Sequence, residues 1–345
     1  MAYSAIDKSS SLASTTLYTG NGTTAHAITG VGFQADFNWI KNRETTDVPN
    51  MSTSVMGANK YLITSSNDTE QSGSENLQSW QSDGFTVGND NQFNQSADGY
   101  VSWNWKGGTT SGISGTADIT PSAYSFNQAA GFSALKYTGN AGAIRTVLHG
   151  LGAAPELIII KQLTSGTNAW VVGADAIVSN WGGVLTLNTT AAIFTNAYFG
   201  GAVPDATKFS ISDTSEVNSS GTYLALCYRS IKGFSRIGKY AGNALADGPA
   251  VYTGFKPSFI LIKPINYAAA WTIVDNKRMG YNRENEVIIP NDAVAEGSGL
   301  QYVDFLSNGF KITSAAAEVN QSYNYLYMAF GQPLVSSNNI AATAI

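Results

Sequence analysis

Three lysines occupy the same place in three similar stretches of the sequence. Lys41, Lys161 and Lys263 each close a short apolar stretch that ends in isoleucine followed by lysine. A lysine ammonium carries three hydrogen-bond donors on a flexible stem, so it suits an anion or a protein partner. A solvated strand end or a surface ion pair is the more ordinary role, and such pairs add little stability. The three lysines are therefore candidate partner contacts.

Tryptophans are the second candidate, because their flat apolar faces can stack against sugar rings. Trp80 and Trp181 lie where the similar segments diverge, and with Trp271 they are predicted to be exposed and to be candidate glycan contacts. Trp103 and Trp105 share one face of a predicted strand whose counterparts are apolar. These two are predicted to belong to the core.

Catalytic groups are scarce. His149 aligns with a threonine in another copy, and His26 lies at a predicted turn, so neither indicates a general base. Paired carboxylates for glycoside hydrolysis must face each other across a cleft. The nearest candidates, which recur at similar positions in different copies, are Glu70, Asp175, Asp275 and Glu296. A repeated position favours a structural role, and we predict no catalytic residue and no enzyme activity.

Metal and cofactor sites are not predicted either. The chain has one cysteine, Cys227, and two histidines, which excludes an intrachain disulfide and a histidine-rich metal cluster. Cys227 is expected to be a small apolar filler. Asn67-Asp68, Asn89-Asp90-Asn91 and Asn291-Asp292 offer oxygen ligands, but none has the spacing of a calcium loop. Turns are their ordinary explanation, and calcium binding stays open.

Composition indicates an all-β protein with a weakly charged surface. Aromatic residues make up 11% of the 345 residues, and 35 glycines supply turns. Only 12% of residues are charged, and the net charge is -5 without a basic run. Nucleic acid is therefore an unfavourable partner, since phosphate binding needs clustered lysine and arginine.

Four landmarks recur three times in the same order and with nearly constant spacing. They are a Tyr-x-Gly-Asn turn, the strand that ends in lysine, a Phe-containing strand, and an asparagine followed by a closing strand. The copies of the first begin at Tyr18, Tyr137 and Tyr240. The asparagines of the last are Asn94, Asn218 and Asn320. We infer three tandem copies of one unit of about a hundred residues.

Strand periodicity specifies the fold of that unit. The lysine-ending strands of copies two and three are apolar on both faces, which is typical of a strand in the middle of a sandwich or between packed units. No segment has a sustained helical period. We predict three tandem antiparallel β-sandwich, jelly-roll-like repeats.

The predicted boundaries follow from composition shifts. They are an N-terminal arm (1–16), repeat 1 (17–106), a linker (107–130), repeat 2 (131–233), repeat 3 (234–334) and a C-terminal tail (335–345). The N-terminus lacks the apolar stretch of a secretory signal, and no segment is apolar for long enough to span a membrane. We expect folding in a bacterial cytoplasm without membrane insertion.

Several strings resemble a family of tandem β repeats. The resemblance rests on the following strings: Tyr137–Asn140 with Gly150-Leu151-Gly152, Tyr252–Phe255 with Phe259–Lys263, Asp304–Phe310, Tyr327–Phe330 and the tail Val335–Ala344. The family occurs in structural and tail-fibre-annotated proteins of bacteriophages, especially marine and cyanobacterial ones. Copy one departs from it, because Thr53 and Met56 stand where an acidic and a basic residue are expected beside Gly57.

The resemblance implies a non-enzymatic virion protein whose partners are other virion proteins. A tail fibre or other host-facing adhesin, built as a homo-oligomer with a trimer favoured, is the first hypothesis. A host surface glycan or receptor is a further possible partner. A capsid decoration or head-fibre protein, a carbohydrate-binding module and a polysaccharide-degrading enzyme remain alternatives.

Overall fold

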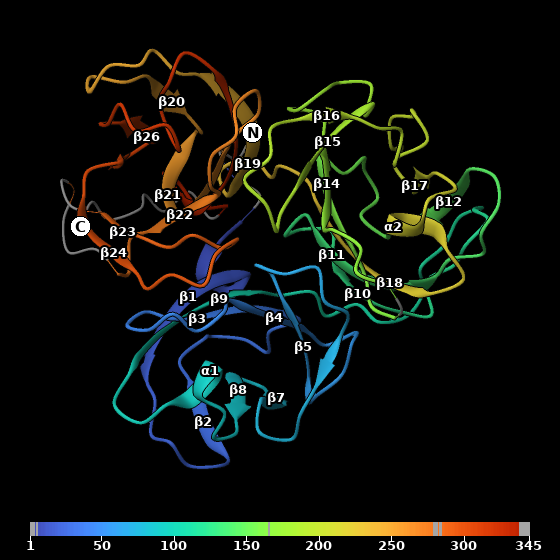
Figure 1. Cartoon of the computed structure of the whole chain (residues 1–345), viewed down its shortest axis with the longest axis horizontal. Coiled ribbons are helices and arrows are strands. Elements are labelled where there is room, and N and C mark those ends of the chain that lie inside the picture. The colour runs from blue at the N-terminus through green and yellow to red at the C-terminus, as the bar shows by residue number, and fades with distance from the viewer. Residues whose placement is uncertain (1–3, 5, 165, 279–281, 283–284, 338–345) are drawn as a thin grey trace.

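Three lobes surround a common centre in the computed structural model (Figure 1), which describes residues 4, 6–164, 166–278, 282 and 285–337. Regular structure in these residues is almost entirely antiparallel strand. Helix is confined to two four-residue helices, α1 (Asn91–Asn94) and α2 (Ser215–Asn218), and the 3-10 turn η1 (Ser9–Ser11). The all-β prediction is confirmed.

Each lobe contains a main sheet in which the lysine-ending strand is central. In unit 1 (residues 13–105) the main-sheet order is β1-β9-β3-β4-β5-β6. These strands are β1 (Ala13–Thr19), β9 (Gly99–Trp105), β3 (Phe37–Asn42), β4 (Asn50–Thr53), β5 (Lys60–Ile63) and β6 (Gln71–Ser72). A small second sheet has the order β2-β8-β7. It consists of β2 (His26–Thr29), β8 (Gly84–Val87) and β7 (Leu77–Gln81).

Unit 2 (residues 123–228) repeats this order and adds one edge strand. Its main sheet runs β10-β11-β18-β13-β14-β15-β16, and its small sheet is β12-β17. The strands are β10 (Ala123–Asn127), β11 (Phe132–Thr138), β12 (Arg145–Leu148), β13 (Leu157–Gln162), β14 (Val171–Ala174), β15 (Gly183–Thr186), β16 (Phe194–Thr195), β17 (Lys208–Ile211) and β18 (Thr222–Tyr228).

Unit 3 (residues 235–333) has the main sheet β19-β27-β21-β22 and the small sheet β20-β26-β25, with a separate pair β23-β24. Its strands are β19 (Ser235–Ala241), β20 (Ala250–Tyr252), β21 (Phe255–Pro264), β22 (Thr272–Asp275), β23 (Asn285–Val287), β24 (Gly297–Leu300), β25 (Val303–Leu306), β26 (Gly309–Ile312) and β27 (Asn324–Pro333).

Two of the predicted boundaries need correction. Part of the predicted linker is strand β10, which pairs along β11, so the linker forms the edge of a sheet. Part of the predicted N-terminal arm is η1 and the start of β1, and Ile6 of the same arm is 4% exposed and packs in the main core. Of the predicted tail, residues 338–345 lie outside the described residues.

The repeated tyrosine and asparagine landmarks hold one turn to the closing strand in every unit. The side-chain oxygens of Asn94, Asn218 and Asn320 accept hydrogen bonds from the backbone N–H groups of the turn, at 2.8, 3.0 and 2.8 Å. The turn tyrosine stacks on the first tyrosine of the closing strand, with ring centroids 4.9 to 5.1 Å apart. A buried asparagine at this place stabilises the turn because it satisfies backbone donors that burial would otherwise leave unpaired.

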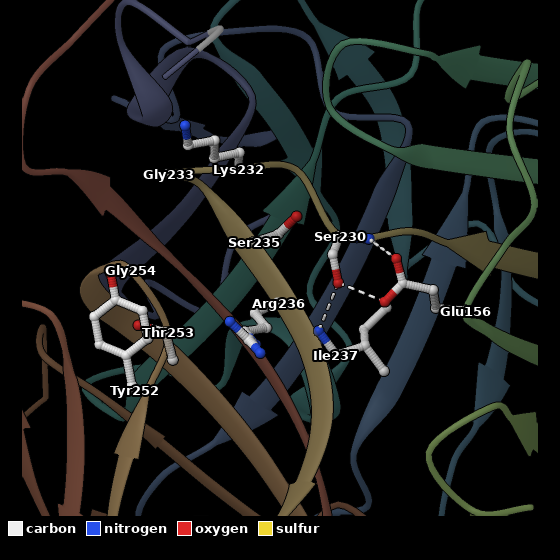
Figure 2. A pocket seen from close by; sticks show the side chains of 10 residues that line it. All are labelled: Glu156, Ser230, Lys232, Gly233, Ser235, Arg236, Ile237, Tyr252, Thr253 and Gly254. Atoms are coloured by element: carbon white, nitrogen blue, oxygen red, sulfur yellow. Dashed lines mark hydrogen bonds between the residues drawn. The ribbon is translucent and has the colours of Figure 1, made fainter. Parts of the chain in front are cut away.

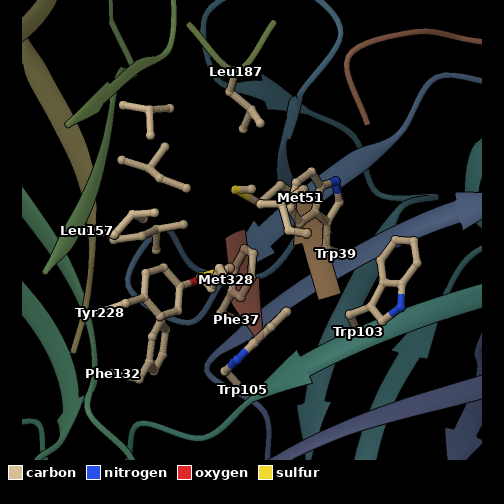
Figure 3. Packing of buried hydrophobic residues seen from close by; sticks show 14 of the residues in the cluster. Phe37, Trp39, Met51, Trp103, Trp105, Phe132, Leu157, Leu187, Tyr228 and Met328 are labelled. Carbon is tan, nitrogen blue, oxygen red and sulfur yellow. The ribbon is translucent and has the colours of Figure 1, made fainter. Parts of the chain in front are cut away.

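The two faces of each main sheet belong to two different cores. Phe37, Leu157 and Phe259 point inward from the central strands into one cluster that all three units share. The opposite faces form a separate cluster in each unit, where the small sheet covers them. The double-sided apolar strands thus lie both within a sandwich and between packed units. Figure 3 shows how the shared core brings together rings from units 1 and 2 with Met328 of unit 3.

Trp103 and Trp105 are 1% and 2% exposed in this shared core, as predicted. The Trp105 ring lies edge-on to Tyr228 of unit 2 and to Phe259 and Phe330 of unit 3, with centroid distances of 6.3, 5.3 and 5.4 Å. Burying a large aromatic side chain contributes about 2 to 3 kcal/mol. The same residue therefore stabilises all three units at once.

Equivalent backbone hydrogen bonds join the units into a closed ring. The N–H of Glu70 donates to the carbonyl of Leu163, that of Ile193 to Ile265, and that of Glu296 to Arg43, at 3.0, 2.7 and 2.8 Å. Unit 1 thus bonds to unit 2, unit 2 to unit 3, and unit 3 back to unit 1. The units are arranged with pseudo-three-fold symmetry.

Candidate functional site

The three strand-end lysines are buried rather than solvated. Lys41, Lys161 and Lys263 are each 0% exposed, so their prediction as surface contacts is wrong. Lys161 Nζ donates to the carbonyl of Asn67 in unit 1, and Lys263 Nζ donates to that of Thr190 in unit 2, both at 3.3 Å. Two of the lysines therefore join neighbouring units.

Lys41 differs from the other two lysines. Its ammonium donates to the carbonyls of Asn42 and Thr45 of its own unit, at 2.5 and 2.9 Å. Burial lowers the pKa of all three lysines to about 8, and at Lys41 the nearby carboxylates Asp47 and Glu296 act in the opposite direction. Carbonyl oxygens rather than carboxylates balance most of the buried positive charge.

Tryptophans join the same two interfaces. Trp170 directly precedes β14, and its indole N–H donates to the carbonyls of Ile63 and Ser66 in unit 1, at 3.3 and 3.1 Å. Trp271 directly precedes β22 and donates to Thr186 in unit 2 at 2.9 Å. Ile63 and Thr186 are the last residues of equivalent strands. We call each set of one tryptophan and one lysine a Trp–Lys clamp: Trp170 with Lys161, and Trp271 with Lys263.

The predicted exposure of two tryptophans is wrong. Trp271 and Trp181 are each 1% exposed, and the Trp181 ring packs edge-on against Phe199 at 5.1 Å between centroids. Trp80 is half-buried on β7 and packs against the outer core of unit 1. Trp181 and Trp271 therefore offer no free flat face for a sugar, and Trp80 offers a part of one.

Unit 1 has no tryptophan at the clamp position, since Pro49 precedes β4 there. A buried group of charges occupies the interface between units 3 and 1 instead. Arg278, which is 0% exposed at its side chain, pairs with Asp275 at 2.7 Å and with Glu296 at 2.8 Å. Arg43 of unit 1 contacts Glu296 and Glu286, each at 2.7 Å. We call these five residues the closing cluster.

Trp103 of unit 1 completes the closing cluster. Its indole N–H donates to the Asp275 carboxylate at 2.9 Å, and the Arg278 guanidinium lies 5.4 Å from its ring. Burial opposes ionisation of Glu296, but hydrogen bonds and charges from Arg43 and Arg278 outweigh it and lower the pKa of Glu296. Burial and the neighbouring Glu296 raise the pKa of Glu286. The cluster thus contains one firmly ionised carboxylate between two arginines.

The sequence carried one signal for this cluster. By strand register, Thr53 and Met56 occupy in unit 1 the positions of Asp275 and Arg278 in unit 3. The acidic and basic residues expected from the resemblance are thus found in unit 3 and form a buried pair there.

The carboxylates weighed for catalysis do not face each other across a cleft. Asp275 and Glu296 converge on Arg278, while Glu70 pairs with Lys60 at another interface. Asp175 is exposed at the start of the turn after β14. In this arrangement Asp275 and Glu296 are neutralised by arginine and act as structural groups.

The remaining polar candidates have local partners. His149 is buried and hydrogen-bonded to the carbonyl of Asp205 and the N–H of Leu151, and burial lowers its pKa. His26 contacts the side-chain oxygen of Asn94 at 2.9 Å. Cys227 is fully buried in the apolar core of unit 2, as predicted.

The asparagine and aspartate turns serve the backbone. Asp90 caps α1 by accepting from Gln92, and Asn291 accepts from the N–H of Trp271. Within the described residues, no three histidine, cysteine, aspartate or glutamate side chains gather as a metal site would require. No described helix has the length and apolar character needed to cross a lipid bilayer.

A cleft of about 490 Å³ opens between units 2 and 3, and no sequence pattern had indicated it (Figure 2). Its walls come from the residue before β13, the β18–β19 connection, the start of β19 and the end of β20. The lining residues with polar or aromatic side chains are Glu156, Ser230, Lys232, Ser235, Arg236, Tyr252 and Thr253. Tyr252 is 61% exposed.

The walls of this cleft are held in place by hydrogen bonds. Glu156 accepts from the N–H and the hydroxyl of Ser230, at 2.9 and 2.6 Å. The Ser230 hydroxyl in turn accepts from the N–H of Ile237 at 3.0 Å. On the other side, the carbonyl of Asn308 accepts from the N–H of Thr253. The cleft is therefore preformed, as small-molecule sites usually are.

No curated protein and no solved structure matches this sequence. A family model that covers all three units and the ring they form does match it, from residue 8 to residue 333. The chain therefore belongs to the family described as a domain of unknown function, DUF7483.

Proposed function

We propose that the chain is a non-enzymatic structural protein displayed on a bacteriophage particle, as a tail fibre or another host-facing adhesin. The observation that carries the proposal is the closed ring of three units around one apolar core. In such a ring the inner faces of the main sheets pack against each other, and the connecting loops remain available for contact with partners. Loops carried on a rigid scaffold are the usual place for recognition.

Chemistry and resemblance support the same role. Of the residues first weighed for catalysis, Asp275 and Glu296 are neutralised by arginine, and His149 is held by neighbouring backbone groups. The strings that resemble phage structural proteins lie in units 2 and 3 and in the tail. A surface with few charges also keeps its character when the salt concentration outside a cell changes.

Assembly belongs to the proposal as well. We propose contacts with other virion proteins and a homo-oligomer in which a trimer is favoured. The single chain already brings three equivalent units around one axis, so a three-fold partner could meet it with matched loops. Light scattering of the purified chain measures its mass: a monomer would remove self-assembly from the proposal and leave docking on other virion proteins.

Locating the chain on purified particles tests the proposal. Gold-labelled antibodies against the chain are expected to bind at the tail or at fibres projecting from it. Label over the head would favour a capsid decoration or head-fibre protein instead. Particles that lack the chain in both microscopy and mass spectrometry would refute a virion role.

A further inference from the structure

We propose that the cleft between units 2 and 3 binds an acidic saccharide, with Tyr252 stacking on the sugar ring and Arg236 holding its carboxylate. The inference rests on the proposed host-facing role and adds a site and a ligand class to it. Neither residue was among the glycan contacts expected from the sequence.

The size of the cleft fits a ligand of this kind. Its volume of about 490 Å³ lies within the roughly 300–1,000 Å³ typical of small-molecule sites. Its openness to solvent allows a longer chain of sugars to continue beyond it. A single sugar ring with its substituents can therefore occupy the cleft while its neighbours remain outside.

Tyr252 supplies the flat surface. Its side chain is 61% exposed although it lies at the end of β20, whose neighbour Val251 is 8% exposed. A Cβ built on Gly254 would lie 3.5 Å from the Tyr252 hydroxyl, so the ring of Tyr252 lies beside this turn. Gly254 has φ +86°, a conformation that favours glycine. The turn thus fixes an exposed aromatic ring at the mouth of the cleft.

Arg236 supplies the charge. It is exposed on β19, and its guanidinium interacts with the hydroxyl of Tyr327, which is itself 3% exposed. A guanidinium has five N–H donors in a planar fork, and one hydroxyl can accept two of them at most. The fork matches a carboxylate, which it can bind through two parallel hydrogen bonds.

The partners of the charged walls favour an anion at Arg236. The Glu156 carboxylate is held by the hydroxyl and N–H of Ser230, whereas the Arg236 guanidinium has more donors than its contact with Tyr327 uses. In the view of Figure 2, Arg236 lies between Tyr252 and the Ser230–Glu156 pair. A ligand that stacks on Tyr252 therefore meets the guanidinium next.

Saturation-transfer NMR on the full chain tests the site. The probes are galacturonic acid, N-acetylneuraminic acid, the methyl ester of galacturonic acid, and galactose. We expect transfer to at least one of the two acids and at least tenfold weaker binding of the neutral methyl ester and galactose. Equal signals from an acid and its neutral counterpart would refute recognition of the carboxylate, and no signal from either acid would overturn the proposal.

Variants assign the binding to the cleft. Tyr252→Ala and Arg236→Leu are expected to weaken the acid signal at least tenfold. Tyr267→Ala removes another exposed tyrosine, and Lys239→Leu removes another exposed cation from β19, so both are expected to bind as the unchanged chain does. Binding that survives in both cleft variants, with circular dichroism showing an intact fold, would overturn the proposal.

Inorganic phosphate separates sugar recognition from simple anion binding. If phosphate displaces the acid at equal concentration, and Tyr252→Ala does not weaken phosphate binding, the cleft is an anion site and the saccharide proposal fails. A chain that is present on particles but binds neither acid would refute this inference alone. A chain that binds an acid but is absent from particles would refute the virion role alone.

Discussion

The interfaces between units 1 and 2 and between units 2 and 3 are chemically alike, whereas the interface between units 3 and 1 is different. The first two contain a Trp–Lys clamp, in which indole and ammonium groups donate to backbone carbonyls of the preceding unit. The third contains the closing cluster of two arginines and three carboxylates. All three share the same backbone hydrogen bond.

This difference separates the interactions that close the ring from those that specify the order of the units. The same backbone hydrogen bond occurs at all three interfaces, so the backbone fold of the units is sufficient to close the ring. The side chains make the joint between the first and last units unlike the other two. If a unit packed in the wrong order, a surface that forms a Trp–Lys clamp would face the residues of the closing cluster. The buried charges of that cluster would then lack partners, which costs several kcal/mol. The comparison suggests that distinct side chains keep the three units in register.

The largest expected effect comes from removing a clamp tryptophan. Trp271→Ala leaves a cavity and an unpaired carbonyl at Thr186, and we expect a loss of about 4 kcal/mol in the free energy of unfolding. Urea denaturation followed by far-UV circular dichroism measures it. Trp80→Ala, at a half-buried position against the outer core of unit 1, is the control and should cost clearly less. Equal losses of stability in the two variants would show that the Trp–Lys clamp makes no special contribution.

Breaking the closing cluster is expected to cost about 3 kcal/mol. Asp275→Ala leaves the buried Arg278 with Glu296 as its remaining carboxylate and the indole N–H of Trp103 without its acceptor, and breaking a buried ion pair is strongly destabilising. The double variant Asp275→Thr with Arg278→Met installs the pair that unit 1 carries, Thr53 and Met56. It should recover most of the loss, because replacing a whole buried pair is often neutral. A double variant as unstable as the single one would contradict this interpretation.

The buried lysines predict a free energy of unfolding that rises with pH, by about 1 kcal/mol per pH unit for each lysine. Lys161 and Lys263 have a pKa of about 8 when folded, against an ordinary 10.5. Between about pH 8 and 9 the unfolded chain therefore binds more protons, and the free energy of unfolding should rise with pH, by up to about 1.4 kcal/mol per unit for each lysine.

Above about pH 9 this trend should reverse. Burial raises the pKa of Cys227 and of several tyrosines, so those groups release protons from the unfolded chain first. Urea midpoints at pH 8.0, 8.5 and 9.0 check the rise, and a midpoint at pH 9.5 checks its reversal. The double variant Lys161→Met with Lys263→Met should reduce the rise to the part that Lys41 contributes, and an unchanged slope in that variant would assign the effect to other groups.

The smallest effect is expected at a partly exposed ion pair of a clamp interface. Lys60 pairs with Glu70, whose side chain is 11% exposed, but the Lys60 side chain is 37% exposed. Lys60→Ala should therefore change the free energy of unfolding by about 0.5 kcal/mol or less. A loss comparable to that of Asp275→Ala would mean that exposed charges also hold the ring together.

Sequence patterns were sufficient to predict the strands and turns and part of the core. Landmark spacing located the turn that Asn94, Asn218 and Asn320 hold, and alternation placed Trp103 and Trp105 inside. These features are local, since they depend on strand period and on a turn within one unit.

Features that depend on contacts with neighbouring units could not be predicted from these local sequence patterns. A lysine after an apolar strand is usually solvated, and only the carbonyls of another unit make burial of Lys161 and Lys263 favourable. Trp271 is buried for the same reason. The cleft at Tyr252 combines segments that are distant in sequence, and no period marks such a meeting point.

The shared core also has a consequence for synthesis on the ribosome. Trp105 needs Tyr228, Phe259 and Phe330 to cover it, and the last of these is made more than two hundred residues later. Until then the nascent chain displays the apolar inner face of its first sheet, which chaperones and proteases can reach. Fragments that end after unit 1 or unit 2 should therefore aggregate, and completion of the chain should release it from chaperones in a single late step.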